Sequence, residues 1–288
     1  MTDRLTRNRS KYWPDKTLHE IKLEEPKMDS KLSEDEIVIS KPKKLKTSSK
    51  LPVSTKAVKS IELPPNWKVI YDNIVQMRKE TPAVVDTMGC SHWADKNIDP
   101  KVSRFQVLVS LMLSSQTRDE VTYATMVELK KNGLSVEYID NISTSELEAM
   151  INKVGFYRRK AAFIKKTANT LKEVYDGDIP STLEELIKLP GVGPKMANLT
   201  MQEAWNKVTG IAVDTHVHRI TNRLKWVKTK TPEQTQAELE AKVPREHWRD
   251  FNHLLVGFGQ SICRPVKPKC SECLNCTICP SSTNKYLF

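Results

Sequence analysis

The candidate chemistry of this chain centres on a lysine that follows a glycine-rich turn. The string Leu189-Pro-Gly-Val-Gly-Pro-Lys195 lies between two helical patterns. We expect the first helix to begin at the capping box Ser181–Glu184 and the second to begin near Lys195. Gly191 and Gly193 remove side chains from the turn, so that backbone N–H groups of the second helix can approach an anion such as phosphate. On this pattern alone, an anion-binding turn and a plain linker between helices are equally well supported.

Lys195 is the first candidate for covalent chemistry. A lysine in the first turn of a helix lies at the positive end of the helix dipole, and burial adds desolvation; both favour the free amine. A free amine can attack an electrophilic carbon and leave a Schiff base. Asp214, nineteen residues further along the chain, could orient this lysine or accept its proton. The alternatives are that Lys195 only binds phosphate and that Asp214 only caps a helix.

The cysteines form the second candidate site. Five of the six fall between residues 263 and 279, and the other is Cys90. In a large basic chain without a visible signal segment, this density indicates metal or cluster ligation rather than disulfides. Two sets of four compete on spacing, one that starts at Cys263 and one that runs C-x2-C-x2-C-x2-C from Cys270. Zinc and an iron–sulfur cluster both remain open at this point.

The elements that position these residues are expected to be helices. Glycine is scarce, with 9 residues, and strand-like alternation is rare, so an all-α fold is the simplest expectation. Ser103 is predicted to cap a buried helix, Gly155 to end another in the left-handed conformation, and Asp214 to cap a third. The predicted helices cover about residues 66–81, 105–113, 119–131, 143–155, 157–175, 181–188, 195–205, 214–226, 232–242 and 245–262.

The charge distribution suits a polyanionic partner without proving one. The chain has a net charge of +11 and a pI near 9.3. Residues 1–60 hold 15 Lys/Arg and 9 Asp/Glu, and the remaining 228 residues hold 31 and 26. We interpret residues 1–60 as a disordered basic tail. Lys41-Pro-Lys-Lys-Leu-Lys46 is similar to a nuclear localisation signal, although a solvated charge run is the alternative. No apolar run approaches the ~20 residues of a membrane span, and no secretory signal is visible.

Three stretches together resemble the endonuclease III family of helix-hairpin-helix DNA glycosylases. They are the string that ends at Lys195, the segment Val213-Asp-Thr-His-Val217, and a C-x6-C-x2-C-x5-C spacing. The likeness covers about residues 61–280. It implies that Lys195 is the nucleophile and that Asp214 is catalytic. It also implies a [4Fe–4S] cluster and leaves Cys276 spare. The ligands selected by the family spacing are Cys263, Cys270, Cys273 and Cys279.

The same resemblance implies an organisation in two lobes. A six-helix barrel lobe with the hairpin would span residues 97–206. An iron–sulfur lobe would combine residues 61–96 with residues 207–288.

Further residues are predicted to contact DNA. The string Leu113-Ser-Ser-Gln-Thr-Arg-Asp119 resembles the family's turn whose glutamine enters the duplex, so Gln116 would fill the space of an extruded base. Phe156 would act as a wedge where the family often has leucine. An exposed turn residue and a core anchor are the respective alternatives. The predicted phosphate contacts are Arg158, Arg159, the hairpin glycines Gly191 and Gly193, and Arg264 and Lys267 in the basic loop between the cysteines.

The function implied by the resemblance is a bifunctional DNA N-glycosylase and AP lyase that excises oxidised pyrimidines in base excision repair. A monofunctional adenine-mismatch glycosylase is one alternative, but that relative lacks the lysine nucleophile. A non-catalytic DNA-binding module is the other. We expect damaged double-stranded DNA as the partner, no membrane, a monomer, and contacts of the tail with other repair proteins. The expected location is the nucleus, with the mitochondrion as a second site.

Overall fold

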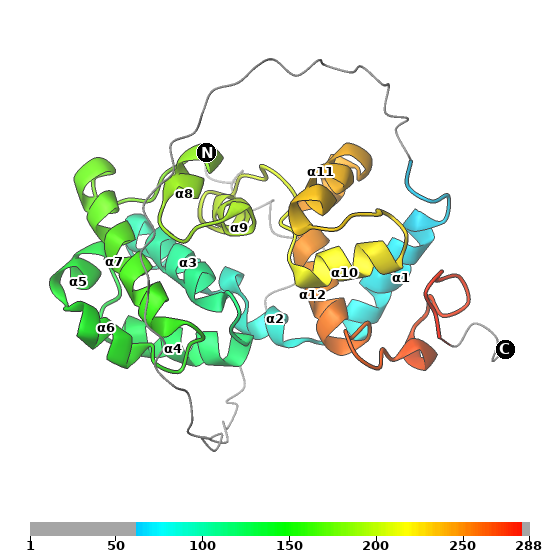
Figure 1. Cartoon of the computed structure of the whole chain (residues 1–288), viewed down its shortest axis with the longest axis horizontal. Helices are drawn as coiled ribbons and strands as arrows, with labels where there is room; N and C mark the ends of the chain where they lie inside the picture. The colour runs from blue at the N-terminus through cyan, green and yellow to red at the C-terminus, as the bar shows by residue number, and fades with distance from the viewer. Residues whose placement is uncertain (1–61, 284–288) are drawn as a thin grey trace, which may run out of the picture. The chain divides into compact units, whose positions relative to one another are not determined.

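The structure, a computed structural model, describes residues 62–283 (Figure 1). The predicted tail, including Lys41–Lys46, lies outside the described residues. Within residues 62–283 the regular secondary structure is entirely helical, which confirms the all-α prediction. None of the helices in this range is long and apolar enough to cross a membrane.

Twelve α-helices and three short 3-10 helices follow one another along the described residues. The α-helices are α1 (Trp67–Glu80), α2 (Val84–Met88), α3 (Pro100–Ser114), α4 (Asp119–Lys131), α5 (Val136–Asn141), α6 (Thr144–Met150), α7 (Tyr157–Val174), α8 (Leu183–Lys188), α9 (Pro194–Ala204), α10 (Thr215–Arg223), α11 (Pro232–Lys242) and α12 (Trp248–Ser261). The 3-10 helices are η1 (Cys90–Trp93), η2 (Arg245–His247) and η3 (Cys270–Glu272).

The first hydrophobic core is built around α3. Every residue from Phe105 to Leu113 is buried, as expected of a helix that is covered on all sides. Helices α4, α7 and α9 pack directly on α3, and α5 and α6 pack on α7. The core runs from Trp93 to Ala212 along the chain. The helix-hairpin-helix formed by α8 and α9 is therefore fixed to the best buried helix of the chain.

The second hydrophobic core joins α1 to the C-terminal helices α10, α11 and α12. Helix α1 packs along α12 although nearly 170 residues separate them (Figure 1). Trp67, Tyr71, Trp226 and Phe251 form its aromatic centre, with ring centroids 6.1–6.4 Å apart in each contact. Aromatic pairs at this separation stabilise a core beyond the area that they bury. The predicted lobe boundaries at residues 97 and 207 stay predictions.

Helix α2 and its neighbours connect the two cores through partly buried polar contacts. Asp86 of α2 accepts hydrogen bonds from Arg78 of α1 (2.6 Å) and His253 of α12 (2.8 Å). Gln260 of α12 accepts a hydrogen bond from the Val85 amide (3.1 Å). The side-chain amide of Gln260 donates to Asp119 at the start of α4 (2.7 Å). Because Asp119 belongs to the first core region, these bonds tie α12 to both cores.

Two predicted helix starts are wrong by a few residues. Helix α3 begins at Pro100 and is capped by Asp99, which accepts hydrogen bonds from Lys101 N (2.7 Å) and Val102 N (3.3 Å). Ser103, the predicted cap, is buried inside the helix, because an Asp-Pro pair starts the helix earlier. Helix α8 is capped by Thr182, one residue after the predicted Ser181.

The predicted cap at Gly155 is also wrong, and the reason is steric. Helix α6 ends at Met150, and the residue in the left-handed conformation is Phe156, with φ 57°. A Cβ atom on Gly155 would lie 2.7 Å from the carbonyl oxygen of Gln116. Glycine is therefore needed here for the close approach of two turns, not for a positive φ. By contrast, the predicted cap at Asp214 is confirmed.

Candidate active site

The hairpin turn has different requirements at its two glycines. Gly191 has φ 79°, and a Cβ atom there would lie 2.4 Å from the ring of Phe163. Gly193 is the N-cap of α9, and a Cβ atom there would meet no atom of the described residues within 4 Å. Pro194 follows as the first helical residue. The backbone at Gly193 is thus open to a ligand, next to the N–H groups that begin a helix and have no partner within it.

Lys195 lies half-buried in the first turn of α9. Burial raises the pKa of the Cys90 thiol and of the Asp119 carboxyl and lowers that of the His216 imidazole; the positive charge of Lys195 acts on all three groups, against the first two shifts and in the same direction as the third. The lysine side chain therefore lies where α4, α9 and α10 come together. No hydrogen bond or ion pair occupies its ammonium group among residues 62–283.

Asp214 combines a structural position with a reactive one. Its Oδ1 accepts a hydrogen bond from the Val217 amide (2.8 Å), so that it caps α10. Burial lowers the pKa of the His216 imidazole. The negative charge of Asp214 acts against this shift, and the positive charge of Lys195 adds to it. Both predicted catalytic residues therefore act on the same imidazole and lie in one cluster. Capping employs one carboxylate oxygen, which leaves the other available to substrate or to Lys195.

Two neighbours of Lys195 were missed by the sequence analysis. Burial raises the pKa of Asp119, against the hydrogen bond from Gln260 and the charge of Lys195. Burial also raises the pKa of Cys90 to about 12, so the thiol stays protonated and does not compete as a nucleophile. Asp119 is the last residue of the string Leu113–Asp119, which also contains Gln116. An acidic residue at the start of a predicted helix can be recognised in the sequence, so this position did carry a signal. Its hydrogen-bond partner Gln260 belongs to α12, which is distant in sequence.

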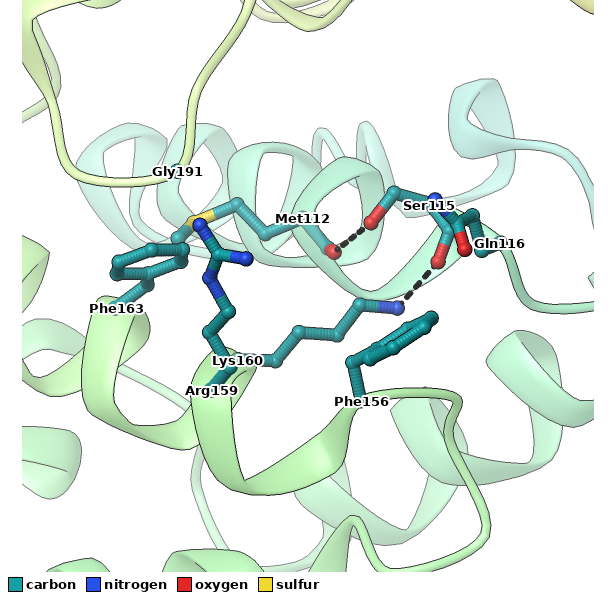
Figure 2. A pocket seen from close by; sticks show the side chains of 8 residues that line it. All are labelled: Met112, Ser115, Gln116, Phe156, Arg159, Lys160, Phe163 and Gly191. Atoms are coloured by element: carbon teal, nitrogen blue, oxygen red, sulfur yellow. Dashed lines mark hydrogen bonds between the residues drawn. The ribbon is translucent and has the colours of Figure 1, made fainter. Parts of the chain in front are cut away.

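Gln116 and Phe156 lie on two turns that face each other (Figure 2). Both have left-handed backbones, with φ 51° and 57°, and both are exposed; Phe156 is 66% exposed and is no core anchor. Arg159 lies over the ring of Phe163 at 5.2 Å from its centroid. The pocket between the turns is lined by Met112, Ser115, Gln116, Phe156, Arg159, Lys160, Phe163 and Gly191. The structure thus gathers four of the predicted DNA-contact residues at one pocket: Gln116, Phe156, Arg159 and Gly191.

The other predicted DNA contacts lie outside this pocket. Arg158 is exposed and lies over the ring of its neighbour Tyr157. Arg264 and Lys267 are exposed on the loop that follows α12. Arg223 of α10 holds this loop by donating hydrogen bonds to the carbonyls of Arg264 (2.7 Å) and Pro265 (2.8 Å).

The cysteines line a largely apolar pocket at the end of α12, beside Leu224, Phe258 and Ile262. Burial raises the pKa of Cys273 to about 11, and three further contributions in the same direction come from Cys279, Cys263 and Cys270. These four sulfur atoms therefore lie near one another. Cys276 is buried, and its sulfur contacts the Ser282 hydroxyl at 3.6 Å.

The donor chemistry of this pocket suits a thiolate-bound cluster. Arg223 donates a hydrogen bond to the sulfur of Cys263 (3.5 Å), which would stabilise a thiolate. Within the described range, no group of three His, Cys, Asp or Glu side chains is arranged to hold a metal ion. All five cysteines between residues 263 and 279 instead line one pocket, and its largely apolar wall would limit the solvent exposure of a cluster held there.

Comparison with known proteins defines the class. Residues 109–245 match the family described as HhH-GPD superfamily base excision DNA repair protein. Endonuclease III-like protein 1 of Gallus gallus is 55% identical over 221 residues, which cover 76% of this chain and 79% of that protein. The protein of the same name from Mus musculus is 52% identical over 221 residues, with coverage of 76% and 74%.

A solved structure of endonuclease III supports the same assignment. It is described as a trapped endonuclease III–DNA covalent intermediate with an estranged adenine. It matches with a TM-score of 0.66 and 28% identity, covering 76% of this chain and 97% of that chain. The helix-hairpin-helix glycosylase fold predicted from the sequence is thereby confirmed. The chain belongs to the endonuclease III family.

Proposed function

We propose that this protein is a bifunctional DNA N-glycosylase and AP lyase that removes oxidised pyrimidines from double-stranded DNA during base excision repair. The observation that carries the proposal is the position of Lys195. Its amine has no hydrogen-bond partner among the described residues, stands in the first turn of α9, and shares the neighbourhood of His216 with Asp214. A solved relative trapped as a covalent DNA intermediate supports covalent chemistry in this family.

The reaction follows from these groups. The amine of Lys195 attacks C1′ of the damaged nucleotide, and the base leaves with the electrons of the glycosidic bond. The sugar ring then opens at its C1′–O4′ bond, and O4′ takes up the proton that Asp214 received from the lysine, which gives a Schiff base. Loss of a C2′ proton allows β-elimination, which breaks the C3′–O3′ bond and cuts the strand. Asp214 accepts the lysine proton and stabilises the positive charge that develops on the sugar.

The hairpin and the two turns suit the grip on DNA that base extrusion requires. A base inside a duplex must be flipped out before C1′ can be reached. The open backbone at Gly193 and the N-terminus of α9 would hold a phosphate beside the reacting sugar. Gln116 and Phe156 project from adjacent turns, and their exposure suits insertion into the vacated space.

The cysteine pocket would hold a [4Fe–4S] cluster through Cys263, Cys270, Cys273 and Cys279. Such a cluster would supply cross-links between the end of α12 and the C-terminal segment. The loop from Arg264 to Lys269 is also held by the protein itself, because Arg223 donates hydrogen bonds to its backbone carbonyls. This loop presents exposed cations to a DNA backbone. We also propose a nuclear location, on the basis of Lys41–Lys46.

The test compares lesions and separates two products. The protein is incubated with duplexes that carry thymine glycol, 8-oxoguanine, or adenine opposite guanine, and free base and strand breaks are measured separately. We expect thymine glycol to be released together with strand scission. Release of adenine without scission would support the monofunctional alternative. Binding without release of any base would support the non-catalytic one.

A further inference from the structure

Lys160 is a buried cation that takes no part in the proposed chemistry. It is the fourth residue of α7 and is only 6% exposed. Its ammonium donates three hydrogen bonds to the turn that carries Gln116. The acceptors are the carbonyls of Leu113 (2.7 Å) and Ser115 (2.5 Å) and the hydroxyl of Thr117 (3.0 Å). Figure 2 shows this side chain running between Arg159 and Phe156 toward Ser115.

The two turns are also joined directly. The Thr117 hydroxyl accepts a second hydrogen bond, from the Gly155 amide (3.1 Å). Gly155 lies so close to the other turn that an added Cβ atom would stand 2.7 Å from the Gln116 carbonyl oxygen. Gln116 and Phe156, which both have left-handed backbones, directly adjoin these contacts. A backbone held in the left-handed region at non-glycine residues persists only where its surroundings fix it.

The position of Lys160 is unfavourable for a lysine that has only a packing role. Burial lowers the pKa of Lys160 to about 8, and no carboxylate among residues 62–283 offsets this effect. Neutral acceptors alone therefore compensate the buried charge. A buried ammonium without an acidic partner costs free energy unless its hydrogen bonds are well made. All three of its bonds go to the segment between Leu113 and Thr117, so their effect is concentrated on the Gln116 turn.

We propose that Lys160 is a positioning residue that locks the Gln116 turn and the Phe156 turn into one rigid two-pronged element for entering the duplex. This inference rests on the proposed function, because it assigns the two prongs to base extrusion. Lys160 does not touch the reacting atoms. Its loss should therefore impair extrusion of a paired base and spare the covalent step at Lys195 once the sugar is accessible.

The chain offers a matched control on the same helix. Lys165 of α7 also donates three hydrogen bonds to backbone carbonyls, those of Ile139 (2.7 Å), Asp140 (3.0 Å) and Ile142 (2.7 Å). These acceptors lie at the end of α5, away from the pocket. Lys160→Met and Lys165→Met thus each remove three hydrogen bonds from a lysine ammonium to neutral acceptors, and only the first change affects the prongs.

The experiment compares single-turnover excision of thymine glycol from a duplex with borohydride trapping on an abasic single strand. A 2-aminopurine opposite the lesion reports unstacking by fluorescence. We expect Lys160→Met to lose at least about tenfold in duplex excision, together with the 2-aminopurine signal, since several hydrogen bonds disappear. Trapping on the single strand should stay within about twofold of wild type. Lys160→Arg should restore part of the loss, and Lys165→Met should match wild type.

Several results would overturn the inference. One is unchanged duplex excision by Lys160→Met. Another is an equal loss on both substrates by a variant that melts like wild type. If Lys160→Met does not fold, Gly155→Ala tests the same contact between the two turns, because the added Cβ presses on the Gln116 carbonyl. We expect this variant to lose duplex excision and to keep trapping on the single strand. An equal loss on both substrates would count against the proposal. A wild-type protein that traps neither substrate would instead refute the proposed function.

Discussion

Replacement of Gly191 by alanine should destabilise the protein through two separate effects. The backbone at Gly191 has φ 79°, and an alanine held there costs about 1–2 kcal/mol. The new Cβ would also stand 2.4 Å from Cδ2 of Phe163, and overpacking of this kind costs about 1–3 kcal/mol. The expected total is therefore about 2–5 kcal/mol. For a folded region of this size, at about 2–4 °C per kcal/mol, that loss lowers the melting temperature by roughly 4–20 °C.

Gly193 provides the control within the same turn. In the part of the chain that the structure describes, an added Cβ at Gly193 has no neighbour within 4 Å, and the φ of −103° at this position is open to any residue. The free energy of unfolding of Gly193→Ala should therefore lie within about 1 kcal/mol of that of wild type. The assay is thermal unfolding followed by circular dichroism, with Phe163→Leu added to Gly191→Ala to measure the steric part by a double-mutant cycle. Equal melting temperatures for Gly191→Ala and Gly193→Ala would refute the geometry assigned to the hairpin.

Three further predictions concern the reaction, the pH dependence of stability and the cysteines. Asp214→Asn keeps an oxygen for the Val217 amide but loses the charge, so base excision should fall about 10²-fold while the melting temperature holds; near-normal turnover would reduce Asp214 to a cap. Burial would raise the pKa of Asp86, but hydrogen bonds from its neighbours outweigh it and lower the value from 3.8 to about 2. Because the unfolded chain then binds the proton more readily, this carboxylate contributes about 2 kcal/mol above pH 4, and the contribution is lost as the pH falls toward 2. Asp86→Asn should remove it at pH 7, as urea unfolding at pH 7 and pH 3 would show; an unchanged stability at pH 7 would contradict this. Cys263→Ala should lose bound iron and sulfide in elemental analysis, whereas Cys276→Ala should keep both, and the reverse pattern would overturn the ligand assignment.

The residues that could be predicted from the sequence are those whose partners lie nearby in the chain. Asp214 caps α10 by a bond to the amide three residues on, and the hairpin string carries its own glycines and proline. The N-cap of α3 was misplaced because Asp99 and Ser103 are both acceptable cap residues, and only the Asp-Pro pair decides between them.

The residues that could not be predicted are buried polar groups with distant partners. Asp119 is held by Gln260, 141 residues away in sequence. Lys160 donates to carbonyls 45 and 47 residues away, and backbone carbonyls leave no trace in side-chain patterns. Gly257 is another residue whose role depends on a partner that is distant in sequence, in this case Arg78. A Cβ at Gly257 would lie 2.2 Å from the Arg78 guanidinium, so this glycine is set by a residue on another helix.

The most direct test of the central claim is borohydride trapping with a matched pair of lysine variants from the hairpin. Lys188 is exposed in the last turn of α8, and Lys195 is half-buried in the first turn of α9. Wild type and Lys188→Gln should both become covalently bound to a duplex that carries an abasic site, because borohydride reduces the Schiff base. Lys195→Gln should still bind this duplex but form no covalent product. Undiminished trapping by Lys195→Gln would contradict the account and move the nucleophile to another residue.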